Sequence, residues 1–429
     1  MKRRGFLKSA GLGGVAPLVV PGSVLGKDGA VAPSERVTLG CIGVGGQGSG
    51  NMRSLMNDER VQVVSICDVD AGHRASGLAA AKLKEGDGTG DFREVVGRGD
   101  IDTVMIATPD HWHSLITVAA ARAGKDIYCE KPLAASIGEG RFVSDLVKKE
   151  GRVLQCGTWR RSGQHTRLGC EWVRNGYIGE LKEIEVGVPG KFAVSGGFTG
   201  LEKPEEVPVG FDYEMWTGPA AEAAYTAARC HFNFRWVAEY APGYITDWGV
   251  HFIDVAQWGL GADETGPVSV EARNVVRRDA GIYDAPEGFE LIYRYANGVK
   301  MRMFSTTDAS TYGIKFIGTE GWVFTENQKL ETGPKELRKK RIKEGDERLY
   351  FSNNHHRNFI DCVKSREATA APVEVAHRSA SACHIGAIAA ELGGGVFGWD
   401  PEAERFVGEK AGVANGRLMR EMRGDWELV

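Results

Sequence analysis

Several features that mark common classes of binding protein are missing from this chain. There is no excess of positive charge, because the formal net charge is -4 and the pI is near 6.3, and we therefore expect no nucleic-acid partner. The eight cysteines form no C-x-x-C pair and show no metal-ligand spacing, so no metal site is expected. After the N-terminal segment, no apolar run is long enough to span a bilayer. What remains is the composition of a globular protein.

The N-terminus resembles a twin-arginine export signal, and residues 1–32 are interpreted as this signal with a linker. Arg3 and Arg4 precede Phe-Leu-Lys, and a modestly apolar segment, residues 10–25, follows them. Lys2 occupies the position where Ser or Thr is usual. The alternative is an uncleaved membrane anchor, but the apolar segment is short and contains two prolines. The resemblance implies an exported, periplasmic protein with no membrane span after signal removal.

The length favours two domains, because 429 residues exceed what one hydrophobic core usually organises. In residues 36–156, short apolar runs alternate with helical stretches, as in parallel strands joined by right-handed crossovers. This pattern predicts an N-terminal Rossmann domain of the α/β class. Its expected strands are residues 37–42, 61–67, 103–107, 127–129 and 153–156.

The pattern changes in residues 157–350, where longer runs alternate apolar and polar residues. They predict an α+β domain with a large open, mostly antiparallel sheet, which favours homodimers or homotetramers through that sheet. Residues 351–429 are expected to form C-terminal helices and a tail that pack back on the two domains. The expected strands are 181–188, 268–275, 288–295, 298–303 and 311–317; the expected helices are 166–175, 245–258, 353–364 and 376–392; the tail from 397 is expected to be irregular.

A glycine-rich turn follows the first expected strand and leads into a helix, which is the arrangement of a dinucleotide site. Glycines leave room for a pyrophosphate, and the start of the helix offers free N–H groups and the positive end of its dipole. The residues expected to bind the cofactor here are Gly43, Gly45, Gly46, Gln47 and Gly48. Asp68 ends the next apolar run and can accept hydrogen bonds from an adenosine ribose, which favours NAD over NADP. The alternative is a purely structural turn.

Two later turns also follow expected strands, and ligands of open parallel sheets bind at that edge. Thr108, Pro109 and His113 lie in the loop after the third strand, where a nicotinamide ribose would lie. Glu130 and Lys131 follow the fourth strand and are likewise expected to contact the cofactor. A lysine that follows a buried strand and precedes a proline is not expected to project freely into solvent. The alternative to a site role is that it only forms an ion pair with Glu130.

A polar stripe lies on an otherwise apolar helix. Asp247, His251 and Asp254 are spaced i, i+4 and i+7, so they share one helix face. The polar side chains of such a stripe must either face a polar cavity or form hydrogen bonds with other buried groups. A buried Asp–His pair and metal ligation by these three residues are the alternatives to a substrate site.

These landmarks together resemble the glucose-fructose oxidoreductase, inositol dehydrogenase and rhizopine-catabolism family (Gfo/Idh/MocA). The resemblance covers nearly the whole chain after the signal and is carried by residues 130–132, Glu-Lys-Pro, and by Asp247-x-x-x-His251. It implies that Lys131, Asp247 and His251 are catalytic around a sugar or polyol carbon. The closing segment, residues 354–366, looks like an exported subgroup of carbohydrate-degrading bacteria.

Two positions depart from the family pattern. Residues 241–243, Ala-Pro-Gly, stand where consecutive glycines are frequent, so the loop that faces the substrate is expected to be stiffer. Trp159 stands where related chains often have a glutamine, which leaves the orientation of the substrate open.

The chemistry of the side chains agrees with the implied roles. Oxidation of a secondary alcohol needs a base, and His251 is suited because the pKa of an imidazole lies near neutrality. Lys131 would polarise the same oxygen, and Asp247 would bind a second hydroxyl and hold His251. Further candidates for the sugar pocket, each also plausible as a structural residue, are Arg160, Arg161, His165, Trp236 and Tyr240.

The main hypothesis is therefore an NAD-dependent oxidoreductase acting on CH–OH groups of a small carbohydrate, with NAD held tightly because an exported protein has no dependable supply of it. The first alternative is a glycoside hydrolase that uses transient C3 oxidation, elimination, hydration and re-reduction. The second is a sugar-sensing module that keeps the cofactor without turnover. Retention of the Glu-Lys-Pro motif favours the dehydrogenase.

Overall fold

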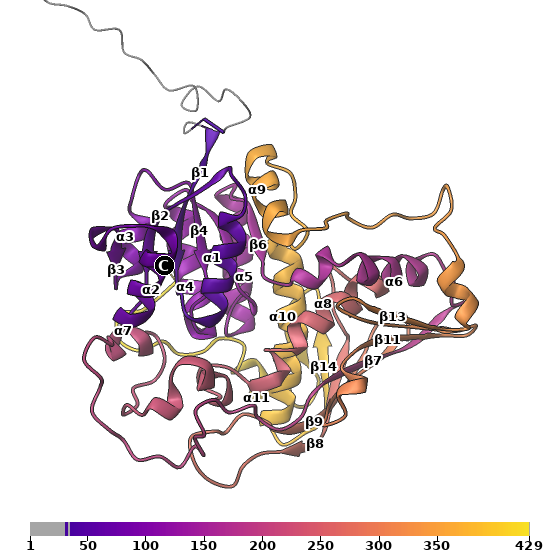
Figure 1. Ribbon diagram of the computed structural model, residues 1–429. Coiled ribbons are helices and arrows are strands. Elements are labelled where there is room, and N and C mark those ends of the chain that lie inside the picture. Colours follow the sequence, from indigo (N-terminus) through magenta and orange to yellow (C-terminus); the bar gives the residue numbers. More distant parts are fainter. Residues whose placement is uncertain (1–30, 33–34, 429) are drawn as a thin grey trace, which may run out of the picture.

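The computed structural model describes residues 31–32 and 35–428, which form two sheets with helices packed around them (Figure 1). The first sheet has six strands, all parallel, in the order β3-β2-β1-β4-β5-β6. The buried runs of β1 and β2 are paired along their whole length, so the turns that follow both strands meet at one edge. The strands are β1 Val37–Ile42, β2 Val61–Cys67, β3 Gly88–Thr89, β4 Thr103–Ile106, β5 Asp126–Cys129 and β6 Leu154–Cys156.

Helices connect these strands, and their starts carry the expected capping residues. Asp70 accepts backbone N–H groups at the start of the second helix, and Ser136 does so at the start of the fifth. The helices of this half are α1 Gly46–Met56, α2 Ala71–Ala81, α3 Phe92–Val96, α4 His113–Arg122 and α5 Ile137–Lys149. The result is the predicted Rossmann-like parallel sheet.

The second sheet has nine strands in the order β13-β12-β11-β7-β10-β9-β8-β14-β15, and only β7 and β10 pair in parallel. Helices pack against one face of this sheet, whereas the opposite face carries ion pairs such as Arg302–Glu290. The predicted fold class, a Rossmann domain plus a mostly antiparallel open sheet, is confirmed. The strands are β7 Leu181–Pro189, β8 Ser269–Val276, β9 Gly288–Arg294, β10 Lys300–Thr306, β11 Gly313–Gly318, β12 Trp322–Glu326, β13 Lys329–Gly333, β14 Gly395–Asp400 and β15 Arg405–Val407.

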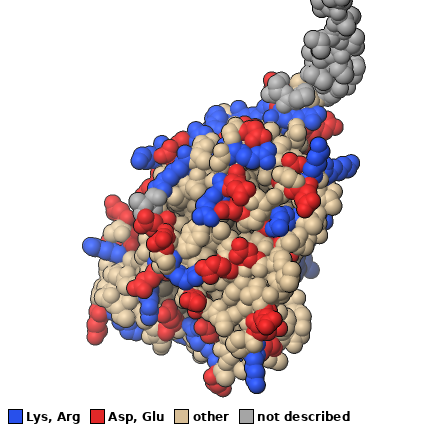
Figure 2. Space-filling view, turned by 90° about the vertical axis from the view of Figure 1, so that its left-hand side faces the viewer, with Lys and Arg blue, Asp and Glu red and all other residues tan. Residues whose placement is uncertain are grey.

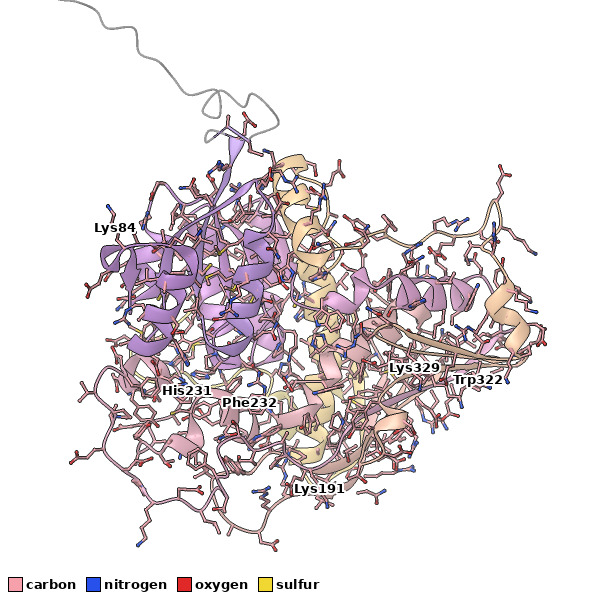
Figure 3. The ribbon with its side chains drawn as sticks, in the orientation of Figure 1. Lys84, Lys191, His231, Phe232, Trp322 and Lys329 are labelled. Atoms are coloured by element: carbon pink, nitrogen blue, oxygen red, sulfur yellow. The ribbon has the colours of Figure 1, made fainter. Side chains whose placement is uncertain are left out.

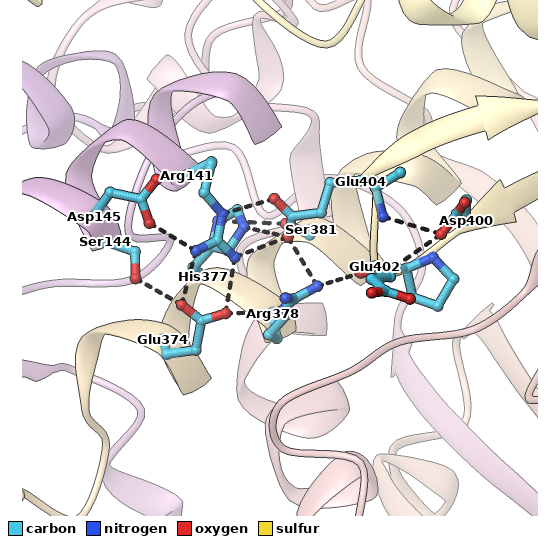
Figure 4. A network of polar contacts seen from close by, with 12 residues as sticks. Arg141, Ser144, Asp145, Glu374, His377, Arg378, Ser381, Asp400, Glu402 and Glu404 are labelled. Atoms are coloured by element: carbon cyan, nitrogen blue, oxygen red, sulfur yellow. Dashed lines mark hydrogen bonds and ion pairs between the residues drawn. The ribbon is translucent and has the colours of Figure 1, made fainter.

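One long helix joins the two halves. The helices of the second half and the C-terminal region are α6 Gln164–Arg174, α7 Tyr213–Thr217, α8 Gly249–Leu260, α9 His355–Ser365, α10 Val373–Glu391 and α11 Ala411–Asn415. Helix α10 packs on α5 of the Rossmann half and on α8 of the other half. A polar cluster holds this junction: Arg141 pairs with Glu374 at 2.8 Å and with Glu404 at 2.8 Å, and Glu404 also pairs with His377 at 2.7 Å (Figure 4).

The C-terminal tail differs from the prediction. It was expected to be irregular from residue 397, but it contributes β14 and β15 to the large sheet and contains α11. The short strands β12 and β13 were also not predicted. Their formation depends on pairing with other strands of the large sheet, such as β14 with β8, which a local sequence pattern does not reveal.

The surface and the N-terminus add two observations. Acidic and basic side chains are interspersed on the face shown in Figure 2, without a large patch of one sign. Among the described residues, no helix has the length and apolar character needed to cross a membrane. The expected export signal lies almost entirely outside the described residues.

Candidate active site

A cavity of about 890 Å³ lies at the carboxyl ends of the Rossmann strands and extends to helix α8 of the second half. Its walls combine the glycine turn after β1, the loops after β2, β4 and β5, and residues of the second half. The cofactor residues predicted from sequence that line it are Gly43, Gly45, Gly46, Gln47, Asp68, Thr108, Pro109, His113, Glu130 and Lys131. The parallel register places all of these turns at one edge of the sheet.

The glycine turn fits a dinucleotide pyrophosphate. Gly43 has φ +79°, and a Cβ there would lie 2.7 Å from the carbonyl carbon of Ala107. A Cβ on Gly46 would meet no atom within 4 Å, so the main chain is open to the cavity at this point. Gly48 does not line the cavity; a side chain there would collide with the carbonyl of Gly43. Gly43 and Gly48 therefore allow the tight turn and close packing of the main chain, while Gly46 allows close approach of the ligand.

Asp68 is oriented by main-chain donors at the end of β2. One carboxylate oxygen accepts the N–H of Val44 at 2.8 Å, and the other accepts the N–H of Asp70 at 2.9 Å. The carboxylate thus lies next to the glycine turn, where the adenosine ribose of a dinucleotide is expected.

Lys131 and Asp247 form an ion pair across the two halves of the molecule. Lys131 Nζ lies 2.6 Å from Asp247 Oδ1 and 2.9 Å from the Asp247 carbonyl oxygen. Arg235 Nε lies 3.2 Å from the same carboxylate oxygen. Burial would raise the pKa of Asp247, but the two cations outweigh it and hold this pKa below its usual value. Asp247 is therefore ionised at neutral pH.

His251 lines the same cavity from helix α8. Its Nδ1 is buried and has no hydrogen-bond partner among the described residues. Burial, and then the charges of Arg160 and Lys131, hold the pKa of His251 well below the usual value of an imidazole. No hydrogen bond joins His251 to Asp247 among the described residues; Asp247 Oδ1 accepts from Lys131 and Arg235 instead. The imidazole is thus neutral, and its lowered pKa makes it a weaker base than the near-neutral imidazole expected from the sequence.

Two buried carboxyl groups lie near this pair. Glu130 accepts a hydrogen bond from Asn51 at 2.8 Å, and burial raises its pKa. Asp110 also lines the cavity, and burial raises its pKa to about 7. Sequence reasoning missed Asp110, although it occupies the loop after β4 that was singled out. A carboxyl group that titrates near neutrality can donate or accept a proton.

Aromatic rings surround the guanidinium of Arg160 at the substrate end of the cavity. Its Cζ lies 4.7 Å from the ring centre of Trp159 and 5.7 Å from that of Trp248. Arg160 also pairs with Glu326 at 3.1 Å. Glu326 and Asn327 lie at the turn between β12 and β13 and line the cavity, so this unpredicted hairpin supplies part of the wall.

Four predicted substrate residues lie outside the cavity. Arg161 is buried and pairs with Asp254 at 2.7 Å and with Asp263 at 2.6 Å. Trp236 is buried and stacks on Phe192, with 4.7 Å between ring centres. These predictions were wrong because residue type does not reveal which side of a loop faces the core.

Tyr240 and His165 lie outside the cavity for different reasons. Tyr240 is buried between the rings of His111 and Trp216. His165 is exposed near the start of α6. Neither lines the cavity, and an exposed histidine and a core tyrosine are indistinguishable from site residues in a single sequence.

The polar stripe is divided by the structure. Asp247 precedes helix α8, whereas Asp254 lies on it, fully buried, and binds Arg161 and Ser379. Asp254 is therefore a structural partner rather than a third ligand, and the metal alternative for this stripe does not hold.

Comparison with known proteins gives family matches over both halves. Residues 37–158 match the GFO_IDH_MocA model, described as "Oxidoreductase family, NAD-binding Rossmann fold". Residues 157–428 match the GFO_IDH_MocA_C2 model, described as "Oxidoreductase family, C-terminal alpha/beta domain".

Curated relatives are matched over part of their length. An inositol 2-dehydrogenase 1 of Saccharopolyspora erythraea is 35% identical over 29% of this chain and 37% of its own. An inositol 2-dehydrogenase of Salmonella typhimurium is 28% identical over 52% of this chain and 54% of its own. A glycosyl hydrolase family 109 protein of Shewanella pealeana is 28% identical over 42% of this chain and 44% of its own. The matched region thus spans about a third to a half of these relatives.

Solved structures share the fold over nearly their whole length. A levoglucosan dehydrogenase in complex with NADH and levoglucosan superposes with a TM-score of 0.62 and 18% identity, over 84% of this chain and 98% of that one. A dehydrogenase of Bordetella pertussis in complex with NADH and UDP-GlcNAcA superposes with a TM-score of 0.64 and 16% sequence identity. The superposition covers 85% of this chain and 98% of that one.

Proposed function

Because this chain belongs to the Gfo/Idh/MocA family of oxidoreductases, we propose that it transfers a hydride between NAD and a secondary hydroxyl carbon of a sugar, glycoside or polyol. One observation carries this proposal. The Lys131–Asp247 ion pair of 2.6 Å and the free, neutral imidazole of His251 line one cavity with the dinucleotide turn.

Three residues are proposed to have separate roles in the reaction. When bound, NAD accepts a hydride at the nicotinamide C4 while the alcohol becomes a carbonyl. His251, which lines the cavity, accepts the hydroxyl proton. Lys131 donates a hydrogen bond to the same oxygen and stabilises the negative charge that develops there. Asp247 holds Lys131 in place through their ion pair and accepts a hydrogen bond from a neighbouring hydroxyl of the substrate.

The opposite wall suits a sugar ring. Trp159 and Trp248 offer aromatic faces to the C–H face of a pyranose, while Arg160 and Glu326 offer a donor and an acceptor to its hydroxyls. Proteins of the same fold bind levoglucosan in one complex and UDP-GlcNAcA in another, which supports a small carbohydrate substrate.

Asp110 favours a second candidate, the redox-assisted glycoside hydrolase. Oxidation at C3 acidifies the C2 proton; a base removes it, the aglycone leaves from C1, water adds, and the hydride returns to C3. This sequence needs a second group that exchanges protons, and Asp110 in the cavity has a pKa raised to about 7 by burial. The glycosyl hydrolase family 109 relative is compatible with this alternative.

A panel of glycosides and free sugars, incubated with the protein and NAD, separates the functions. A keto-sugar with NADH indicates the dehydrogenase, a free aglycone without net NADH indicates the hydrolase, and neither product indicates a sensing module. Lys131→Met should abolish either product while NAD affinity stays within a few-fold, because Lys131 acts on the substrate oxygen. Loss of cofactor binding or of folding in this variant would instead make Lys131 a structural residue.

We also propose export by the twin-arginine route. The support is the Arg3-Arg4 pair before Phe-Leu-Lys, together with the subgroup-like closing segment 354–366. Arg3→Lys combined with Arg4→Lys should retain the protein in the cytoplasm, which cell fractionation measures. Equal periplasmic amounts of variant and parent would contradict the proposal.

Assembly through the large sheet is proposed as well. Its outer face carries acidic and basic residues side by side, such as Arg302 with Glu185 and Lys300 with Glu183. Such a face can be self-complementary across a twofold axis. Light scattering should therefore report a homodimer or homotetramer, and Arg302→Glu should shift it toward monomer.

A further inference from the structure

A segment of the second half closes over one end of the cavity. The main chain at Phe211 pairs with that at Asp70 in an antiparallel bridge. The N–H of Ala71 donates to Gly210 at 2.8 Å, and the N–H of Asp212 donates to Val69 at 3.0 Å. Phe211 lines the cavity beside Asp68. The segment therefore covers the end where the adenosine of a dinucleotide is expected.

Three metal-ligating side chains meet at this junction. Asp70 and His73 lie at the start of α2, and His231 comes from the second half, below the Rossmann helices (Figure 3). One ligand atom from each lies within 4.8 Å of the other two. Within residues 35–428, this cluster joins the two halves directly across the cavity wall.

Asp70 and His231 each have a ligand atom available. Asp70 Oδ1 accepts the N–H groups that cap α2, which leaves Oδ2. His231 Nε2 lies 3.7 Å from that oxygen. This distance is too long for a hydrogen bond, but it is close to the roughly 3.4 Å that separates two ligands of one tetrahedral zinc ion.

The backbone at His231 points to a functional constraint. Its φ is +51°, a left-handed conformation that non-glycine residues adopt at a cost. The ring is held edge to face against that of His73, with 5.1 Å between centres, and 5.4 Å from the ring of Phe211. The strained residue is thus the one that presents its imidazole to the other half.

We propose that Asp70, His73 and His231 bind a divalent transition-metal ion, with Zn²⁺ as the fitting case. Two imidazoles and one carboxylate are a ligand set that suits zinc, and the remaining positions are left for water. The ion ties α2 to His231, whose ring lies 5.4 Å from that of Phe211 in the covering segment. Because the covered end belongs to the dinucleotide cavity, bound metal slows the release of NAD. The effect on NAD release rests on the proposed function, whereas metal binding itself does not.

Zinc binding is measured first, without NAD. Chelator-treated protein is titrated with Zn²⁺ in competition with a chromophoric chelator, and one ion per chain is expected. His231→Ala should weaken binding at least about tenfold, which is the loss that even an outer partner of a metal ligand causes. Asp70→Asn should do the same while it keeps the helix cap, because Asn caps as well as Asp. His165→Ala is the control, since His165 is exposed and outside the cavity.

The release of NADH is measured second, by fluorescence after dilution. Zn²⁺ should slow release from the parent and from His165→Ala, but not from His231→Ala. Failure to bind one zinc ion, or equal binding by parent and His231→Ala, overturns the site. If Zn²⁺ leaves NADH release from the parent unchanged while His231→Ala still releases NADH faster, the link to NAD release is overturned, because His231 would then act on the cofactor directly. Zinc binding by a protein that binds no NAD would keep the site and reject the proposed function.

Discussion

Arg160 and Arg161 are neighbours in sequence with opposite roles, and substitution should separate them. Arg160→Met removes a donor from the cavity wall and should raise KM for the carbohydrate by roughly tenfold, the effect of one hydrogen bond to a charged group. Arg161→Met leaves Asp254 buried and unpaired, so the free energy of unfolding should fall by about 3–5 kcal/mol. Steady-state kinetics and urea unfolding of both variants test this; a KM effect confined to Arg161→Met would reverse the assignment.

Asp68 should set the choice of cofactor. A 2'-phosphate about 4 Å from this carboxylate would cost roughly 4 kcal/mol at an effective dielectric near 20, before screening by salt. Calorimetry should therefore show tighter binding of NAD than of NADP, and Asp68→Ala should narrow the difference. Tighter binding of NADP by the parent would contradict the role of Asp68.

The predicted cofactor residues that line the cavity share one property: they follow a buried strand of a parallel sheet. Lys131 and Thr108 could be found because chain topology alone places such residues at the ligand edge. Arg235 could not, because its pairing with Asp247 depends on how a long irregular segment folds back. Trp236 was misassigned for the same reason, since it follows Arg235 directly but faces the core.

At the scale of elements, the period and length of the apolar pattern decided which helices and strands could be predicted from the sequence. Strands β1 and β2 were predicted with the bounds that the structure shows, because both are apolar runs ended by a turn signal. The hairpin of β12 and β13 is short, and its contribution of Glu326 to the cavity is a tertiary effect. Of the expected polar stripe, Asp247 and His251 line the cavity, whereas Asp254 on helix α8 binds Arg161 and Ser379 instead.

The junction of α5, α10 and the β14–β15 hairpin should be sensitive to acid. Burial would raise the pKa of Glu404, but His377 and Arg141 outweigh it and lower the pKa from 4.5 to about 2. Because the folded pKa is lowered, this contribution to stability is complete above pH 4.5 and is lost as the pH falls toward about 2. Glu404→Gln should therefore destabilise the protein at about pH 5 and by less at about pH 3, as measured by urea unfolding. Asp145→Asn, an exposed member of the same cluster, is the control and should change little.

At the scale of the whole molecule, the cavity is enclosed by parts that are distant in sequence. The Rossmann turns form its floor, and the segment around Phe211 covers its adenosine end. The C-terminal tail packs behind this wall, where the ring of Trp426 lies 4.8 Å from that of Trp112. Release of a dinucleotide therefore requires several contacts between the halves to open together.

This enclosure, combined with the proposed export, leads to the last prediction. A protein that leaves the cytoplasm has no dependable supply of NAD, so it must be loaded before export and must keep its cofactor. A Kd near 1 nM corresponds to about 12 kcal/mol of binding free energy. We expect protein purified without added nucleotide to release close to one NAD(H) per chain on denaturation, and Asp68→Ala to release less. Nucleotide-free protein with only micromolar affinity would contradict this, because a cofactor that exchanges freely cannot close the catalytic cycle on one exported molecule.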